Sequence, residues 1–158
     1  MHDTLLILPG ILLFAYMSLL WLLGLQVRNA GLVDFGWPSG FTALALYFAC
    51  TSDGDLSRRT IIAGMYCACG ARFMLGWIIR NYRDGEDRRW ELWRDRWRNG
   101  RGLFGIRSVP LNLFAFYHAQ TLATLFVFLV PLFLACGNTD PRMHLLEWIG
   151  IATWGRKM

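Results

Sequence analysis

The sequence predicts an all-α protein, a polytopic transmembrane helical bundle that forms one domain over residues 1–158. Of its 158 residues 55% are hydrophobic, and the mean hydropathy is +0.34. The apolar residues lie in long runs, and a block rich in Arg, acids and Trp (80–107) separates two of these runs. A chain this apolar and this short has room for about four or five spans. We therefore expect four full spans, a truncated fifth and an interfacial amphipathic helix.

The first span is expected at about 5–25, an uncharged run that can cross a hydrocarbon core of roughly 30 Å as a helix. The residues before it lack the basic segment of a signal peptide, so we expect this run to stay as an anchor. Further full spans are expected at 31–50, 60–79 and 109–136. The run at 143–155 falls short of the roughly 17 residues that a span needs, so we expect the chain to be cut off within it.

The distribution of basic residues predicts the orientation in the membrane. Nine arginines lie between 80 and 107, on the side of Arg28, whereas the opposite ends of the runs hold Arg58, Arg59 and Arg142. By the positive-inside rule the Arg-rich loop is cytoplasmic and the N-terminus lies outside, in the cell inner (plasma) membrane. The net charge of +5 fits contact with anionic lipid and predicts no nucleic-acid partner.

Three tryptophans of the charged block recur at helical spacing. Trp90, Trp93 and Trp97 would share one face of a helix, with Arg and acidic residues around the rest and Gly100 as its stop. Such a helix should lie in the membrane interface. It could be a structural anchor for the neighbouring spans or part of the mouth of a cofactor site.

Ionisable residues inside apolar runs are costly and indicate a bundle interior or a site. Asp34, Arg72, His118 and Glu147 are the examples here. Asp34 and Arg72 should lie at similar depths in the cytoplasmic half, and an unpaired charge there is expensive, so we predict an Asp34–Arg72 pair. For His118 a hydrogen bond between helices is the simpler interpretation.

Two further patterns suggest a polar pocket inside the bundle. Tyr117, His118 and Gln120 lie close together in the fourth run, where they could line a pocket or bond across helices. Trp37 and Pro38 follow Asp34, and a proline kink there would widen a cavity.

The four cysteines do not form a metal-binding pattern. Cys67 and Cys69 have no second pair, so we expect packing residues and no metal. Cys50 and Cys136 fall at the outer ends of two runs, where a disulfide is possible but less expected than two thiols. The phosphate-binding and hydrolase motifs of soluble enzymes are missing from the sequence.

Two segments resemble a known family. Residues 28–37, RNAGLVDFGW, resemble the N-V-G-L-V-D-x-x-W segment of bacterial DUF1295 proteins, relatives of the steroid 5α-reductases. Residues 80–90, RNYRDGEDRRW, resemble that family's R-N-x-G-x-G-E-D-x-R-Y segment, with Arg83 in place of Gly and Trp90 in place of Tyr.

The resemblance implies a membrane reductase that transfers hydride from NADPH to the β-carbon of a lipophilic enone, steroid-like or isoprenoid, which enters from the lipid bilayer. It also suggests roles for ten residues: catalytic Asp34, Tyr117 and His118; cofactor-binding Asn81, Glu86, Asp87 and Arg89; substrate-pocket Trp37, Arg72 and Gln120. Asp34 would donate the proton unless an ion pair holds it as a carboxylate; Tyr117 or His118 would then be the better donor.

Other functions stay open. The family's later R-H-P-N-Y segment, associated with NADPH binding, is absent, so we expect an N-terminal part of a longer protein and do not expect these 158 residues to be active alone. A methyltransferase resembling isoprenylcysteine methyltransferases is a second possibility. A third is a non-enzymatic membrane remnant or assembly partner, with self-association or a partner subunit.

Overall fold

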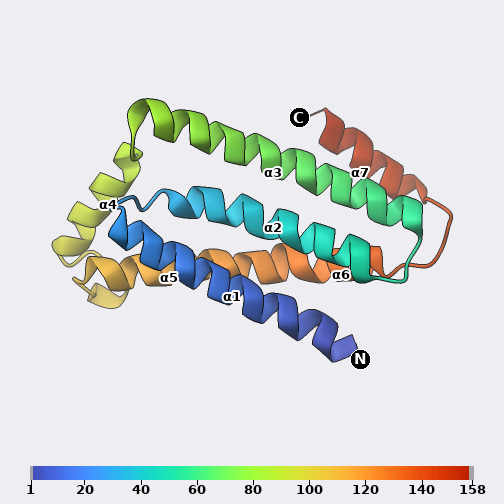
Figure 1. Ribbon diagram of the computed structural model, residues 1–158, viewed down its shortest axis with the longest axis horizontal. Coiled ribbons are helices and arrows are strands. Elements are labelled where there is room, and N and C mark those ends of the chain that lie inside the picture. Colours follow the sequence, from blue (N-terminus) through green and yellow to red (C-terminus); the bar gives the residue numbers. More distant parts are fainter. Residues whose placement is uncertain (1, 157–158) are drawn as a thin grey trace.

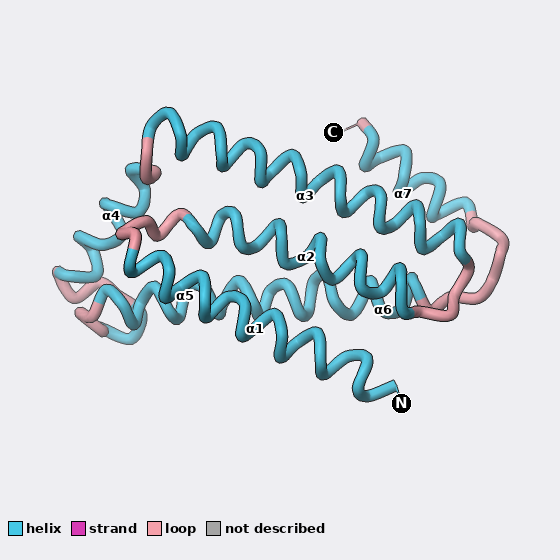
Figure 2. The backbone as a smooth tube through the Cα atoms, viewed as in Figure 1, coloured by secondary structure: helices cyan, strands magenta, loops and turns pink. Residues whose placement is uncertain are grey.

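A computed structural model describes residues 2–156 of the chain, and every regular element in that part is helical. The helices are α1 His2–Gln26, α2 Leu32–Thr51, α3 Leu56–Asp84, α4 Arg88–Arg98, α5 Val109–Thr124, α6 Val130–Cys136 and α7 Leu145–Gly155 (Figure 1). A short 3-10 turn, η1, covers Leu103–Gly105, and a π-helical turn, η2, covers Leu125–Leu129. The loops gather at the two ends of the bundle (Figure 2).

Three segments are long and apolar enough to cross a membrane: Leu6–Gln26, Leu56–Asp84 and Val109–Cys136. They confirm three of the four predicted full spans. α2 is as long as predicted but does not qualify as a span by composition, because Asp34, Ser39 and several small residues interrupt its apolar run. α7 has only 11 residues, too few to cross a bilayer, so a fifth span is not confirmed either.

α2 lies in the middle of the bundle, between α3 on one side and α1 and α5 on the other (Figure 1). Small residues let its neighbours approach: a side chain at Gly70 of α3 would overlap the Thr42 hydroxyl, and one at Gly36 would overlap Leu20 of α1. Close contact through small residues is typical of helices packed in membranes. Because α2 is enclosed by protein, it tolerates a less apolar sequence than a lipid-facing helix.

The last long span changes its winding at η2, directly before Pro131. Proline has no N–H to donate within a helix, and a π turn is one way for the backbone to accommodate the lost bond. α2, by contrast, stays helical through Pro38, so the kink expected there does not interrupt it.

The Arg-rich block contains a break and a short helix across the end of the bundle. α3 ends at Asp84, Gly85 takes a left-handed φ of 71°, and α4 follows and ends as predicted before Gly100. Trp90 and Trp97 are buried, and the Trp90 ring lies 5.1 Å from that of Phe116 on α5. The tryptophan face therefore packs mainly on protein, and only Trp93 is exposed to a large extent.

At the other end of the bundle, Arg58 anchors the loop that leads to α7. Its side chain is only 2% exposed, and its Nε donates to Glu147 Oε1 at 2.8 Å. Its Nη1 and Nη2 donate to the carbonyls of Asp140 and Arg142 at 2.7 and 3.0 Å. Glu147 therefore lies at the start of α7 as the partner of Arg58, not alone inside a span.

The four cysteines are free thiols within the part of the chain that the structure describes. The possible disulfide between Cys50 and Cys136 is not formed: Cys50 is exposed at the end of α2, whereas Cys136 is buried at the end of α6. No group of three or more His, Cys, Asp or Glu positioned to hold a metal ion occurs among residues 2–156.

Candidate functional site: a polar pocket at the Arg-rich end

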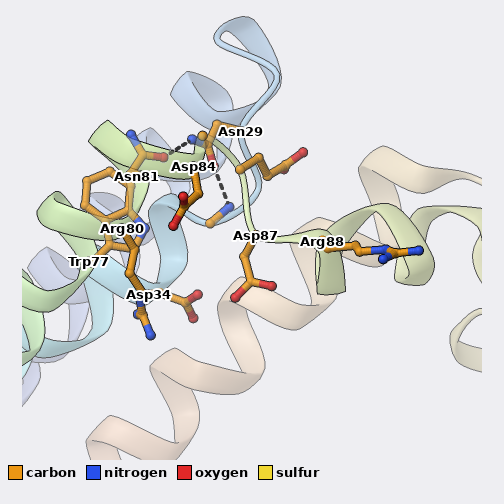
Figure 3. A pocket seen from close by; sticks show the side chains of 11 residues that line it. Asn29, Asp34, Trp77, Arg80, Asn81, Asp84, Asp87 and Arg88 are labelled. Carbon is orange, nitrogen blue, oxygen red and sulfur yellow. Dashed lines mark hydrogen bonds between the residues drawn. The ribbon is translucent and has the colours of Figure 1, made fainter.

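The two segments that resemble the family meet at one end of the bundle. The amide of Asn29 donates to Asn81 Oδ1 at 2.6 Å, and its own oxygen accepts from the Gly31 N–H at 2.9 Å (Figure 3). The Ala30 N–H donates to Glu86 Oε1 at 2.6 Å. Asn81 and Glu86 thus tie the loop before α2 to the end of α3 and the loop that follows.

Two further contacts fix this loop. Arg94 of α4 forms an ion pair with Glu86, with Nη1 at 3.0 Å from Oε1. The Tyr117 hydroxyl of α5 donates to the Ala30 carbonyl at 3.0 Å. Residues of α3, of the loop after it and of α5 therefore contact residues 29–31 directly, and α4 supports them through Glu86, which gives this end a defined geometry.

A polar pocket of about 300 Å³ opens beside this loop. Figure 3 shows its side chains, which come from the loop before α2, from α2 and α3, from the loop between α3 and α4, and from the start of α4. The lining residues are Asn29, Gly31, Asp34, Trp77, Arg80, Asn81, Asp84, Gly85, Glu86, Asp87 and Arg88. Charged and amide groups of this kind bind polar ligands through directed hydrogen bonds.

Arg89 forms ion pairs with two carboxylates at the edge of the pocket. Its side chain lies 2.8 Å from Asp87 and 3.4 Å from Asp34, and it is 62% exposed. Hydrogen bonds from the side chain and backbone of Arg89 hold the pKa of Asp87 below its usual value. The same Asp87 contact raises the pKa of Arg89. Both groups are therefore charged at neutral pH.

The ion partner of Asp34 is Arg89, not Arg72 as predicted. Phe35 packs against Trp77 with ring centroids 5.4 Å apart, and Trp37 packs against Phe73 at 6.1 Å. This register brings Asp34 level with the end of α3, more than one helical turn from Arg72. Arg72 itself is exposed on α3.

An apolar cavity of about 330 Å³ follows the polar pocket along the same two helices. It is lined by Trp37, Phe41, Met65, Tyr66, Cys69, Phe73, Phe128 and Trp154. Trp37 comes one turn after Asp34 on α2, and Phe73 comes one turn before Trp77 on α3. The indole nitrogen of Trp37 is buried without a hydrogen-bond partner in the described residues.

The polar residues predicted to line one pocket from α5, Tyr117, His118 and Gln120, do not lie together. Tyr117 contacts the loop beside the pocket, whereas His118 stacks on Phe14 of α1 at 4.1 Å, with Nε2 at 3.3 Å from the Ser18 hydroxyl. His118 therefore bonds between helices, the simpler of its two interpretations, and does not meet Asp34. Gln120 is half-buried and lines neither of the two pockets.

Seven pocket residues had no predicted role: Asn29, Gly31, Trp77, Arg80, Asp84, Gly85 and Arg88. Asn29 and Arg80 belong to the segments that resemble the family, so their positions offered a signal. Trp77 lies in an apolar run, where a tryptophan is ordinary. Only the packing of α2 against α3 shows that Trp77 lines the pocket.

Long apolar helices around a charged end define a helical membrane protein. A family model described as "Protein of unknown function (DUF1295)" matches residues 20–155, most of the chain. The chain belongs to this family, as the two segments predicted. No curated protein and no solved structure matches it.

Proposed function

We propose that this protein is an NADPH-dependent reductase of lipophilic enones, or contributes one half of such a site. The observation that carries the proposal is the succession of a polar pocket and an apolar cavity along α2 and α3. A polar cofactor and a lipid-soluble substrate need these two environments side by side. The pocket opens at the Arg-rich end, which the positive-inside rule assigns to the cytoplasm, where NADPH is available.

The pocket residues fit one part of a dinucleotide. Arg80 and Arg88 line the pocket, and within residues 2–156 neither has a carboxylate at ion-pair distance. They would hold phosphate oxygens, while Asp84 and Asp87 can accept hydrogen bonds from ribose hydroxyls. The Trp90 N–H, buried without a partner in the described chain, is a further donor beside Gly31. A volume of about 300 Å³ accommodates a part of NADPH, not the whole.

When bound, NADPH supplies the hydride. Asp34 is the residue best placed to hold the proton, because it lies between the polar pocket and Trp37 of the apolar cavity. Arg89 lies 3.4 Å from its carboxylate oxygen, and because Arg89 is exposed it can turn toward an arriving phosphate. Release of Asp34 from Arg89 would let the carboxyl group take up a proton. Tyr117 donates to the Ala30 carbonyl and serves to position the loop.

The first prediction is saturable NADPH binding by the purified protein in detergent, measured by thermal shift or fluorescence. Arg80→Gln should weaken this binding about tenfold or more, since a charged hydrogen bond to phosphate is lost. Arg83→Gln is the matched control, an exposed arginine on the same helix outside the pocket, and should bind as the natural protein does.

NADH and S-adenosylmethionine serve as comparators. Binding of S-adenosylmethionine instead of NADPH would favour a methyltransferase. A folded sample that binds none of the three would refute the proposal for this chain and favour a non-enzymatic or partner-dependent protein.

A further inference from the structure

A second charged pocket lies on the Arg-rich end, where α1 stops between α4 and the start of α5. Its volume is about 480 Å³. Arg28, Arg94 and Arg98 line one part of it, and Leu25, Val109 and Leu113 line another. It shares no lining residue with the polar pocket described above. Its amphipathic wall differs from the polar wall of that site.

The pocket lies at the level of the bilayer surface. The candidate span Leu6–Gln26 ends two residues before Arg28, and the span Val109–Cys136 begins with a residue of the pocket itself. Leu25 and Leu113 belong to these spans. The arginines therefore lie where lipid phosphates lie, and the leucines reach toward the acyl chains.

The three arginines of this pocket differ in whether a carboxylate neutralises their charge. Arg94 is paired with Glu86, and Arg98 has a solvent-exposed contact with Asp95 at 3.2 Å. Arg28 has no carboxylate at ion-pair distance in the part of the chain that the structure describes. Exposed ion pairs are weak, so Arg98 can exchange Asp95 for another anion. Two of the three cations are thus open to a ligand.

The backbone of Arg28 adds an independent observation. Its φ of 55° is left-handed, and it is the only non-glycine residue with positive φ in the described chain. The Asn29 N–H donates to the Gly24 carbonyl at 3.0 Å and closes the end of α1. Glycine or asparagine usually occupies this position after a helix. An arginine at this position adopts an unfavourable backbone conformation. This indicates that its side chain has a function that offsets the strain.

We propose that this pocket binds the phosphate headgroup of an anionic phospholipid from the leaflet on the Arg-rich side. Arg28 and Arg98 bind the phosphate oxygens, because guanidinium groups match phosphate in charge and geometry. Leu25, Val109 and Leu113 contact the glycerol and the upper acyl chains. A free phosphate ion would leave this apolar part of the pocket unfilled, which favours the lipid.

Glu91 is the one carboxylate that lines the pocket, and it opposes an anion. Removing its charge should therefore strengthen binding, whereas removing an arginine weakens it. Opposite effects of two substitutions in one pocket distinguish a binding site from a general loss of folding.

Native mass spectrometry of the protein in a mild detergent tests the proposal, with phosphatidylglycerol and phosphatidylcholine of equal chain length. Phosphatidylglycerol should bind at least about tenfold more tightly. Arg28→Gln with Arg98→Gln should remove most of this preference, and Glu91→Gln should increase it. The double control Arg83→Gln with Arg96→Gln has the same loss of charge outside the pocket and should keep the preference.

Equal binding of the two lipids would overturn the proposal. So would a control variant that loses the preference for phosphatidylglycerol as much as the pocket variant does. Soluble glycerol phosphate is a further arm; if it binds as tightly as the lipid, the lipid assignment is wrong. Arg28→Lys with Arg98→Lys keeps the charge and should restore part of the preference. If the double glutamine variant does not fold, Arg98→Gln and Glu91→Gln alone give the test, since both side chains are exposed.

Discussion

Arg58 shows how one side chain organises an end of the molecule. Its guanidinium group donates to three backbone carbonyls and to both oxygens of Glu147, while its exposed fraction is 2%. A buried cation without such partners would be strongly destabilising. The charge rule predicted Arg58 at a membrane end, but its partners lie 80 to 89 residues later in the chain and no local pattern indicates them.

This ion pair predicts a loss of stability in acid. Hydrogen bonds from Arg58 and from the His144 backbone hold the pKa of Glu147 below its ordinary value of 4.5. The stabilisation is therefore complete above about 4.5 and is lost as the pH falls through the lower pKa of the folded protein. Glu147→Gln should lower the Tm at pH 7 by roughly 2–4 °C, as expected for about 1 kcal/mol.

Thermal unfolding in detergent between pH 7 and pH 3.5 measures this effect. Glu147→Gln should also show a smaller fall of Tm in acid than the natural protein. Glu91→Gln, which removes an exposed carboxylate, is the control. An unchanged acid response in Glu147→Gln would show that this contact does not contribute.

At the scale of elements, apolar runs predicted the long helices well, and the bounds 109–136 agree with the observed span. The same reasoning predicted α2 as a full span, which its composition does not support. A helix enclosed by other helices can be identified by its length but not by its hydropathy. It also assigned the tryptophans of α4 to lipid, whereas Trp90 and Trp97 are covered by protein. Periodicity shows that a face is apolar; it does not show what covers that face.

The contact of α2 with α3 depends on Gly70, so Gly70→Ala should destabilise the protein by about 1–3 kcal/mol through overpacking. The added carbon would meet the Thr42 hydroxyl and, at 3.2 Å, the Pro38 carbonyl. Gly76→Ala on the same helix is the matched control, since nothing lies within 4 Å of its new carbon. Unfolding by denaturing detergent measures both variants, and equal stabilities would exclude close packing at this crossing.

For the whole molecule, the sequence predicted where charge gathers but not how the site is assembled. The two family segments lie about 50 residues apart, and the Asn29–Asn81 hydrogen bond joins them. Depth along the two helices predicts a pair between Asp34 and Arg72, yet the register of aromatic contacts between α2 and α3 places Asp34 at the end of α3, where its ion partner is Arg89. Depth along two helices is a one-dimensional estimate, whereas an ion pair requires the correct faces as well.

The orientation in the membrane is a prediction for the whole chain. Cys50 is exposed at the end of the bundle opposite the Arg-rich block, so it should react from outside intact cells. A membrane-impermeant maleimide should label the natural protein before the cells are opened, and Cys50→Ser should lose that signal. Labelling only after lysis would reverse the predicted orientation.

The position of Arg58 also bears on biosynthesis. Its carboxylate partner lies 89 residues later in the chain, so α3 is made long before the group that neutralises Arg58 exists. At about 5–20 residues per second, this interval lasts roughly 4–18 s. During that time the N-terminal end of α3 must keep a cation solvated, and only the arrival of α7 lets it be buried. Completion of this end of the bundle is therefore linked to the synthesis of α7.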